Sequence, residues 1–198
     1  DFYGPIPIPT LEDLKNPLDE VIEPRATQEE MTNFIETELT ESLKGLPTRT
    51  TQFGRFDKGL AYTILMKYYM HEKNWAKAEE CGRELLKAEY GYGLMDRYAD
   101  IFTLENEGNK EIIFACTEER GTNLQLWHDH ALPGNYPTKN ASIQKWDGYK
   151  VPWPFYRTFE EGDDRLSVLV GEYVGTDGVL FNEESDIAKH GNLYSGAV

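Results

Sequence analysis

The stretch from residue 117 to 160 is rich in flat aromatic rings and in side chains that form hydrogen bonds. Six aromatic residues alternate there with seven amide or carboxylate residues: Trp127, Tyr136, Trp146, Tyr149, Trp153 and Tyr156, and Asn123, Gln125, Asp129, Asn135, Asn140, Gln144 and Asp147. Flat apolar rings suit the C–H face of a pyranose, and amide and carboxylate groups can hydrogen-bond its hydroxyls. This composition permits carbohydrate binding, which is the activity that the family resemblance described below implies.

The sequence also suggests which of these residues face solvent. Trp127 and Tyr136 lie in LWHDHALPGNYPTKN, a polar segment punctuated by glycine and proline, so we expect both rings to be exposed. Trp153 and Tyr156 are expected in the core, with Trp146 between these extremes. The alternative is that the aromatic residues only fix the loops to a scaffold. The candidate ligand-binding residues, considered with the family resemblance below, are Trp127, Tyr136, Trp146, Asn123, Gln125 and Asp129.

Other reactive groups are less informative. His128 and His130 flank Asp129, but the sequence identifies no third and fourth ligand, so no metal site is predicted. Asp177 and Asp186 lie among turn residues that could suit calcium, although EF-hand spacing is absent. We find no P-loop, nucleophile elbow or dinucleotide fingerprint, and we predict no cofactor.

An acidic run, Glu160, Glu161, Asp163 and Asp164, could suggest a glycoside hydrolase. Such enzymes need two carboxylates facing each other about 5–9.5 Å apart, and adjacency in sequence does not supply that geometry. We expect instead that Asp163 or Asp164 caps the next segment and pairs with Arg165, while Phe159 is buried. The prediction is that the protein is not an enzyme, with a glycoside hydrolase as the weaker alternative.

Composition limits the remaining classes. A formal charge of -15 repels phosphate, which argues against nucleic-acid binding and against attraction to anionic lipid. Hydrophobic residues make up 39% and charged residues 28%, as in a globular chain, and no apolar run approaches the roughly 20 residues of a membrane span. Cys81 and Cys116 are expected to be buried free thiols.

Three helices are expected to form the scaffold that supports the aromatic stretch 117–160. Residues 1–26 are rich in proline and should be extended. Thr27 and Glu30 form a capping box that begins a helix, which Gly45 and Pro47 end near Leu46. A second helix spans 57–71 and has an apolar face wide enough to be buried on more than one side.

A third helix begins near Asn74, with Trp75, Ala78, Gly82 and Leu85 on one face, and Gly82 is expected to allow close approach of a neighbouring helix. The short link after His71 makes the last two helices an antiparallel pair of tetratricopeptide type. Beyond Leu86 we expect mostly loops, with a strand at 111–117 and a hairpin at 171–181.

Three stretches together resemble the SusD/RagB family of outer-membrane glycan-binding lipoproteins. They are FYGPIPIPT with the capped helix, the long block from RFDKGLAYTILMKYY to EIIFACT, and WDGYKVPWPFYRTFEEGDDR. The chain resembles an internal part of such a protein, without the family's N-terminal lipidation segment and C-terminal closing segment.

The resemblance implies a mainly α, SusD-like α/α superhelix in which tetratricopeptide-like pairs support a loop-rich region with a few short strands. One partial domain, 1–198, would comprise the lead-in 1–26, the scaffold 27–90 and the ligand-binding region 91–198. The implied function is cell-surface binding of an oligo- or polysaccharide and its delivery to a TonB-dependent, SusC-type transporter, from a lipid anchor at the outer membrane. The alternative from another class is a tetratricopeptide scaffold that binds a peptide or protein.

Overall fold

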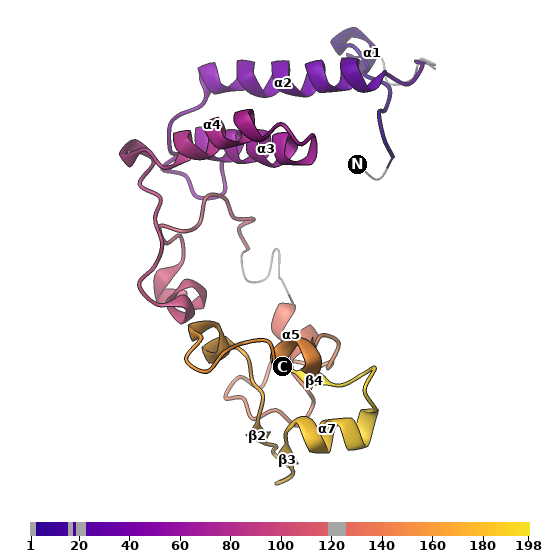
Figure 1. The fold of residues 1–198 in the computed structure, drawn as a ribbon, viewed down its shortest axis with the longest axis vertical. Coiled ribbons are helices and arrows are strands. Elements are labelled where there is room, and N and C mark those ends of the chain that lie inside the picture. The colour runs from indigo at the N-terminus through magenta and orange to yellow at the C-terminus, as the bar shows by residue number, and fades with distance from the viewer. Residues whose placement is uncertain (1–2, 16–17, 19–22, 119–125) are drawn as a thin grey trace. The chain divides into compact units, whose positions relative to one another are not determined.

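The computed structural model describes residues 3–15, 18, 23–118 and 126–198, and the chain divides into two compact units (Figure 1). The first unit comprises Asp1–Gly93 and Ile112–Ala115, and the second comprises Leu94–Glu111 and Cys116–Val198. The first change of unit along the chain therefore comes after Gly93. No helix among the described residues is long and apolar enough to cross a membrane.

The first unit is helical. It contains α1 (Leu11–Lys15), α2 (Gln28–Gly45), α3 (Lys58–His71) and α4 (Trp75–Leu85). The capping box of Thr27 and Glu30 is present, and the side chains of Asp57 and Asn74 accept backbone hydrogen bonds at the starts of α3 and α4. The three long helices are therefore confirmed. The short helix α1 lies inside the segment that was expected to be wholly extended.

Helix α3 packs against both α2 and α4 (Figure 1), which explains its wide apolar face. The core between these helices consists of Leu65, Tyr69, Ala78 and Cys81, surrounded by partly buried side chains from α2 and α3. The expectation that α3 is buried on more than one side is confirmed, although Ile64 remains partly exposed.

The inward face of α4 differs from the predicted one. Its buried residues are Ala78, Cys81 and Leu85, whereas 61% of Trp75 is exposed. At about 100° per residue, Trp75 lies roughly a quarter-turn from the centre of this buried arc. A Cβ at Gly82 would lie 3.5 Å from Met66 Sδ, an ordinary contact, so packing does not require glycine there.

Within the helical unit, the glycine that packing does require is Gly59, at the start of α3. A Cβ on Gly59 would overlap the hydroxyl of Tyr92, which follows the 3₁₀ turn η1 (Ala88–Tyr90). Tyr92 stacks on Tyr90, and Arg49 lies over the Tyr92 ring, 4.9 Å from its centroid. The aromatic exit from α4 therefore folds back onto the helices that precede it.

The second unit consists mainly of short elements and loops. Its elements in chain order are η2 (Tyr98–Phe102), η3 (Leu104–Asn106), α5 (Trp127–Ala131), β1 (Val151–Pro152), α6 (Trp153–Tyr156), η4 (Asp164–Val168), β2 (Tyr173–Val174), β3 (Leu180–Phe181), α7 (Glu183–His190) and β4 (Gly196–Ala197). Strand β1 pairs antiparallel with β4, with Val151 opposite Ala197, and β2 pairs antiparallel with β3, with Tyr173 opposite Phe181. The hairpin predicted at 171–181 is confirmed.

Two predictions for the loop-rich region are wrong. Residues 111–117 are described throughout and form no strand. Their apolar and β-branched residues favour a strand, but no neighbouring segment among the described residues pairs with them. Cys116, in the same segment, is exposed rather than buried, whereas Cys81 is buried in the helical core as expected. The prediction of a mainly helical chain with a few short strands is confirmed.

Candidate functional site

Four rings of the second unit form a continuous run, which we call the aromatic platform: Trp127, Tyr149, His130 and Trp146. Trp127 stacks on Tyr149 with centroids 5.2 Å apart, Tyr149 lies 5.5 Å from His130, and His130 meets Trp146 edge-on at 4.7 Å. Trp127, Trp146 and Tyr149 are 57%, 48% and 52% exposed. The platform therefore presents three large rings to solvent.

The platform is held together through the backbone of α5. The amide of Trp146 donates to the carbonyl of Asp129 at 2.5 Å, and those of Gly148 and Tyr149 donate to the carbonyl of His130 at 2.5 and 3.1 Å. These carbonyls are among those that a short helix leaves without partners inside the helix. The loop that carries Trp146 and Tyr149 thus supplies hydrogen-bond donors to the end of α5, and α5 carries Trp127 and His130.

Backbone strain accompanies this arrangement. Lys145 and Asp147, on either side of Trp146, have φ values of 57° and 56°. A non-glycine residue in the left-handed region costs of the order of 1–3 kcal/mol and persists only where the surrounding structure fixes it. Lys145 is tied down because its Nζ donates to the carbonyl of Tyr136 at 3.1 Å. Trp146 is thus presented from a constrained turn.

The other predicted ligand-binding residues are placed differently. Tyr136 is half-buried, and its ring meets the ring of Tyr173 edge-on at 4.9 Å. It therefore packs against Tyr173 and is less exposed than expected. Only 8% of Asp129 is exposed, and its Oδ1 accepts the amide of Gln144 at 2.5 Å, which leaves little of it for a ligand. Asn123 and Gln125 lie outside the described residues.

The second unit also contains a hollow of about 250 Å³, which we call the polar hollow. The loop at Asn135, the segment Asp147–Lys150, the hairpin β2–β3 and helix α7 contribute its walls. Its titratable side chains other than tyrosine are Asp147, Lys150, Asp177, Asp186, Lys189 and His190. Its aromatic wall is formed by Tyr173 and Phe181, whose rings stack 4.7 Å apart. Lys150 Nζ lies over the Phe181 ring, 5.5 Å from its centroid, in a cation–π contact.

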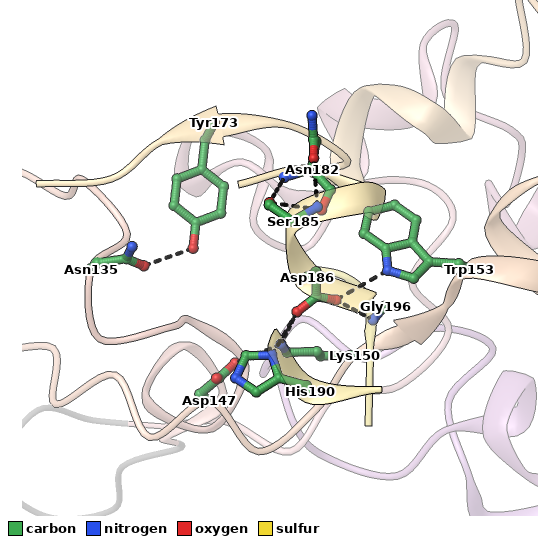
Figure 2. Close-up of polar contacts among 10 residues, drawn as sticks. All are labelled: Asn135, Asp147, Lys150, Trp153, Tyr173, Asn182, Ser185, Asp186, His190 and Gly196. Atoms are coloured by element: carbon green, nitrogen blue, oxygen red, sulfur yellow. Dashed lines mark hydrogen bonds and ion pairs between the residues drawn. The ribbon is translucent and has the colours of Figure 1, made fainter. Parts of the chain in front are cut away.

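Asp186 organises this region (Figure 2). Its side chain is fully buried, and its Oδ2 accepts the Trp153 indole N–H at 3.0 Å and the Gly196 amide at 2.8 Å. Its Oδ1 contacts Lys150 Nζ at 3.2 Å and His190 Nδ1 at 2.8 Å. Burial alone would raise the pKa of Asp186, but these hydrogen bonds together hold it below its ordinary value. The carboxylate is therefore charged and fixes Lys150 and His190 in place.

A second hydrogen-bonded group, formed by Tyr173, Asn135 and Asp177, also lines the polar hollow; Figure 2 shows its Tyr173–Asn135 contact. The Tyr173 hydroxyl donates to Asn135 Oδ1 at 2.9 Å, and Asn135 Nδ2 donates to Asp177 Oδ2 at 3.1 Å. Burial, followed by nearby carboxylates such as Asp147 and Asp177, raises the pKa of Tyr173 to about 12, so the phenol stays protonated and remains a donor. Asp177 also accepts the Val179 amide at 3.0 Å, which shapes the turn of the hairpin.

Sequence reasoning missed Tyr149, His130 and the polar hollow. Tyr149 belonged to the aromatic group that was recognised, but its stacking on Trp127 joins residues 22 positions apart. The hollow joins Asn135 to Lys189, and no local spacing indicates such a contact. The one available signal was the density of polar and aromatic residues between 117 and 160.

Members of the acidic run and the candidate calcium ligands are held by hydrogen bonds within the protein. Asp163 accepts the Arg165 amide at 3.0 Å and pairs with its guanidinium, as predicted, and Asp164 accepts the Tyr98 amide at 2.7 Å. Two members of the acidic run thus accept hydrogen bonds that hold the fold together, one from a neighbouring residue and one from Tyr98. Asp186, considered for calcium, is surrounded by hydrogen-bond donors instead. No cluster of metal-ligating residues occurs within the described ranges.

The helical unit has a hollow of its own, of about 320 Å³, beside α2 and α3. Its lining includes Met31, Ile35 and Tyr68, as a peptide-binding groove would require, but Tyr3–Ile6 of the same chain forms one wall. Arg25 Nη1 holds this segment by donating to the carbonyl of Tyr3 at 2.7 Å. The chain itself therefore occupies part of the surface that a peptide would use.

Comparisons with known proteins identify the fold. No protein-family model and no curated protein matches the sequence. Two solved structures from Bacteroides fragilis NCTC 9343 do match: a SusD-like protein at 23% identity and a TM-score of 0.63, and a SusD superfamily protein at 16% identity and a TM-score of 0.65. They cover 81% and 90% of this chain, which spans 32% and 42% of theirs.

A SusD superfamily protein from Bacteroides vulgatus ATCC 8482 also matches, at 28% identity and a TM-score of 0.42, over 46% of this chain and 20% of that one. The chain thus spans less than half the length of each of these structures. The two longer matches show that the chain has a SusD-like fold, as the sequence resemblance predicted.

Proposed function

We propose that this chain, which has a SusD-like fold, is part of a SusD/RagB-type protein that binds an oligo- or polysaccharide at the cell surface. In this proposal the glycan is passed to a TonB-dependent transporter of the SusC type, and a lipid anchor holds the protein at the outer membrane. The protein captures nutrient glycans and catalyses no reaction on them.

The observation that carries the proposal is the aromatic platform. Trp127, Trp146 and Tyr149 are each about half exposed, and their rings remain in contact with one another or with His130. Large exposed rings cost solubility, and a soluble loop has no need of three together. Rings held by backbone hydrogen bonds and a constrained turn are already ordered, so a sugar chain that stacks on them loses little affinity to ordering the site.

The test is retention of the protein in native gels that contain soluble polysaccharides. We expect Trp127→Ala and Trp146→Ala each to weaken retention by about tenfold or more, as truncation of a central aromatic contact does at other interfaces. The matched control is Trp75→Ala, because Trp75 is a similarly exposed tryptophan of the helical unit. Equal retention of all three variants and the unsubstituted chain would contradict the site, and no retention by any glycan in a broad panel would contradict the function.

The transporter partnership needs a separate experiment in the full-length protein. Affinity purification from outer membranes should recover a TonB-dependent transporter with the tagged protein. Protease treatment of intact cells should digest the tagged protein if it faces the medium. Recovery only from the periplasmic fraction would contradict the proposed location.

A further inference from the structure

The polar hollow adjoins a second depression, and the two share three side chains. Asp147, Lys150 and His190 line both the hollow of about 250 Å³ and a neighbouring one of about 370 Å³ that extends towards Tyr194. Ligand pockets are typically about 300–1,000 Å³, so the two together are large enough for a small molecule. The shared side chains form a wall that a ligand in either depression would contact.

Two of these side chains keep hydrogen-bonding capacity. Asp147 is one-third exposed, and the only ion pair recorded for it in the described structure is with Lys150, at 3.5 Å. A carboxylate can accept about four hydrogen bonds, so most of this capacity is open. Lys150 is 12% exposed, and one of its three donors is hydrogen-bonded to Asp186, while Asp147 lies 3.5 Å from the same ammonium group. An acceptor and a donor therefore lie side by side in the wall.

The charges in the hollow favour an uncharged ligand. Asp147, Asp177 and Asp186 line the hollow together with Lys150 and Lys189, and both Lys150 and His190 are already in contact with Asp186. An anion or a cation would have to compete with these pairs. A hydroxyl group both donates and accepts, so adjacent hydroxyls can meet the carboxylate and the ammonium without displacing either.

The aromatic wall adds the apolar part of such a site. Tyr173 and Phe181 are stacked, and Tyr136 supports Tyr173 from the side. Apolar C–H groups of a ligand can pack on these rings while its hydroxyls face the charged side chains. The combination of one apolar wall and alternating donors and acceptors is what a pyranose ring requires.

We propose that the polar hollow is a second binding site, which takes one hexose unit or a similarly small uncharged polyol. It lies next to the aromatic platform along residues 146–150, since Trp146 and Tyr149 belong to the platform and Asp147 and Lys150 to the hollow. The proposal rests on the proposed function in that the hexose would be a unit or branch of the bound glycan. Its residues, however, are separate from those of the platform.

The experiment uses methyl glycosides of glucose, galactose and mannose as probes, with saturation-transfer NMR to detect binding and calorimetry to measure it. The informative variant is Asp147→Asn, because asparagine tolerates the left-handed φ of 56° and keeps the shape of the side chain. Losing a hydrogen bond to a charged group should weaken binding of the best glycoside by about tenfold or more. Lys189→Gln, a change at an exposed lining residue, should weaken it less and guards against a folding defect in the first variant. Trp75→Ala, far along the chain in the other unit, should bind as the unsubstituted protein does.

Each outcome decides the proposal. Absence of saturation transfer to every glycoside, or affinity unchanged in both Asp147→Asn and Lys189→Gln, overturns it. Displacement of a bound glycoside by inorganic phosphate would show an anion site and overturn it too. Loss of glycoside binding in Asp147→Asn without any polysaccharide retention by the unsubstituted chain would support the hollow and contradict the proposed capture of polysaccharides at the platform.

Discussion

Replacement of Asp186 by asparagine should strongly destabilise the second unit. The carboxylate accepts from Trp153 and Gly196 on one oxygen and contacts Lys150 and His190 on the other. An amide has a single acceptor oxygen, so in either orientation its NH₂ group faces two donors. Hydrogen bonds to charged groups are worth about 1.5–3 kcal/mol each, and breaking a buried ion pair costs about 3–5 kcal/mol. We therefore expect a loss of about 3–5 kcal/mol in the free energy of unfolding.

The assay should report on this unit alone. Urea unfolding followed by the NMR signal of the Trp153 indole N–H meets that need, because this proton lies in the hydrogen bond to Asp186. Asp163→Asn is the control, since Asp163 pairs with Arg165 at the surface, and its urea midpoint should not change. Adding Lys150→Met to Asp186→Asn should recover part of the loss by removing an ammonium that has lost its buried partner. A loss below about 1 kcal/mol would refute the view that a charged carboxylate holds this core.

The pH dependence gives an independent check. Because the folded state lowers the pKa of Asp186 below its ordinary value of 3.8, the carboxylate stabilises the folded state above that value. This contribution is lost as the pH falls through the ordinary value towards the folded one. The difference in stability between the unsubstituted chain and Asp186→Asn should therefore shrink on acidification below about pH 4. A constant difference between pH 7 and pH 3 would contradict the assignment.

Two further predictions concern the first unit and the cysteines. Gly59→Ala should lower the melting temperature of the helical unit because its Cβ would overlap Tyr92, whereas Gly82→Ala should raise stability by up to about 1 kcal/mol, since Met66 Sδ lies at contact distance. Equal effects in circular-dichroism melts would contradict this packing. In the native protein a thiol reagent should modify exposed Cys116 quickly and Cys81 only on unfolding, because Cys81 is buried and burial, the largest effect, raises its pKa. Rapid modification of both thiols, counted by mass spectrometry, would show that the helical core is open.

The helices were predictable because their signals are local. Thr27 and Glu30 are three residues apart, and Asp57 and Asn74 precede the helices that they cap. The inward face of α4 was less predictable, since Ala78, Gly82 and Leu85 fit one helical stripe almost as well as Ala78, Cys81 and Leu85. Only packing against α3 decides between these two stripes.

The loop-rich region was harder because its contacts are distant in sequence. Trp153 was correctly expected in the core, but its partner Asp186 lies 33 residues away and resembled a surface turn residue in the sequence. The segment 111–117 has the composition of a strand, yet a strand also needs a neighbour, and composition does not supply one. Trp127 was correctly expected to be exposed, whereas Tyr136 is half-buried because it packs against Tyr173.

Residues 146–150 explain why the site and the stability of the second unit belong together. The backbone amides of this segment complete the end of α5, Trp146 and Tyr149 extend the platform, and Lys150 reaches the buried Asp186. Because Lys150 also lines the polar hollow, a ligand there contacts a side chain that the core already fixes. Such a site is ordered before any ligand arrives, which would lower the entropic cost of binding the proposed glycan. A ligand that binds only the folded form must in turn stabilise this unit.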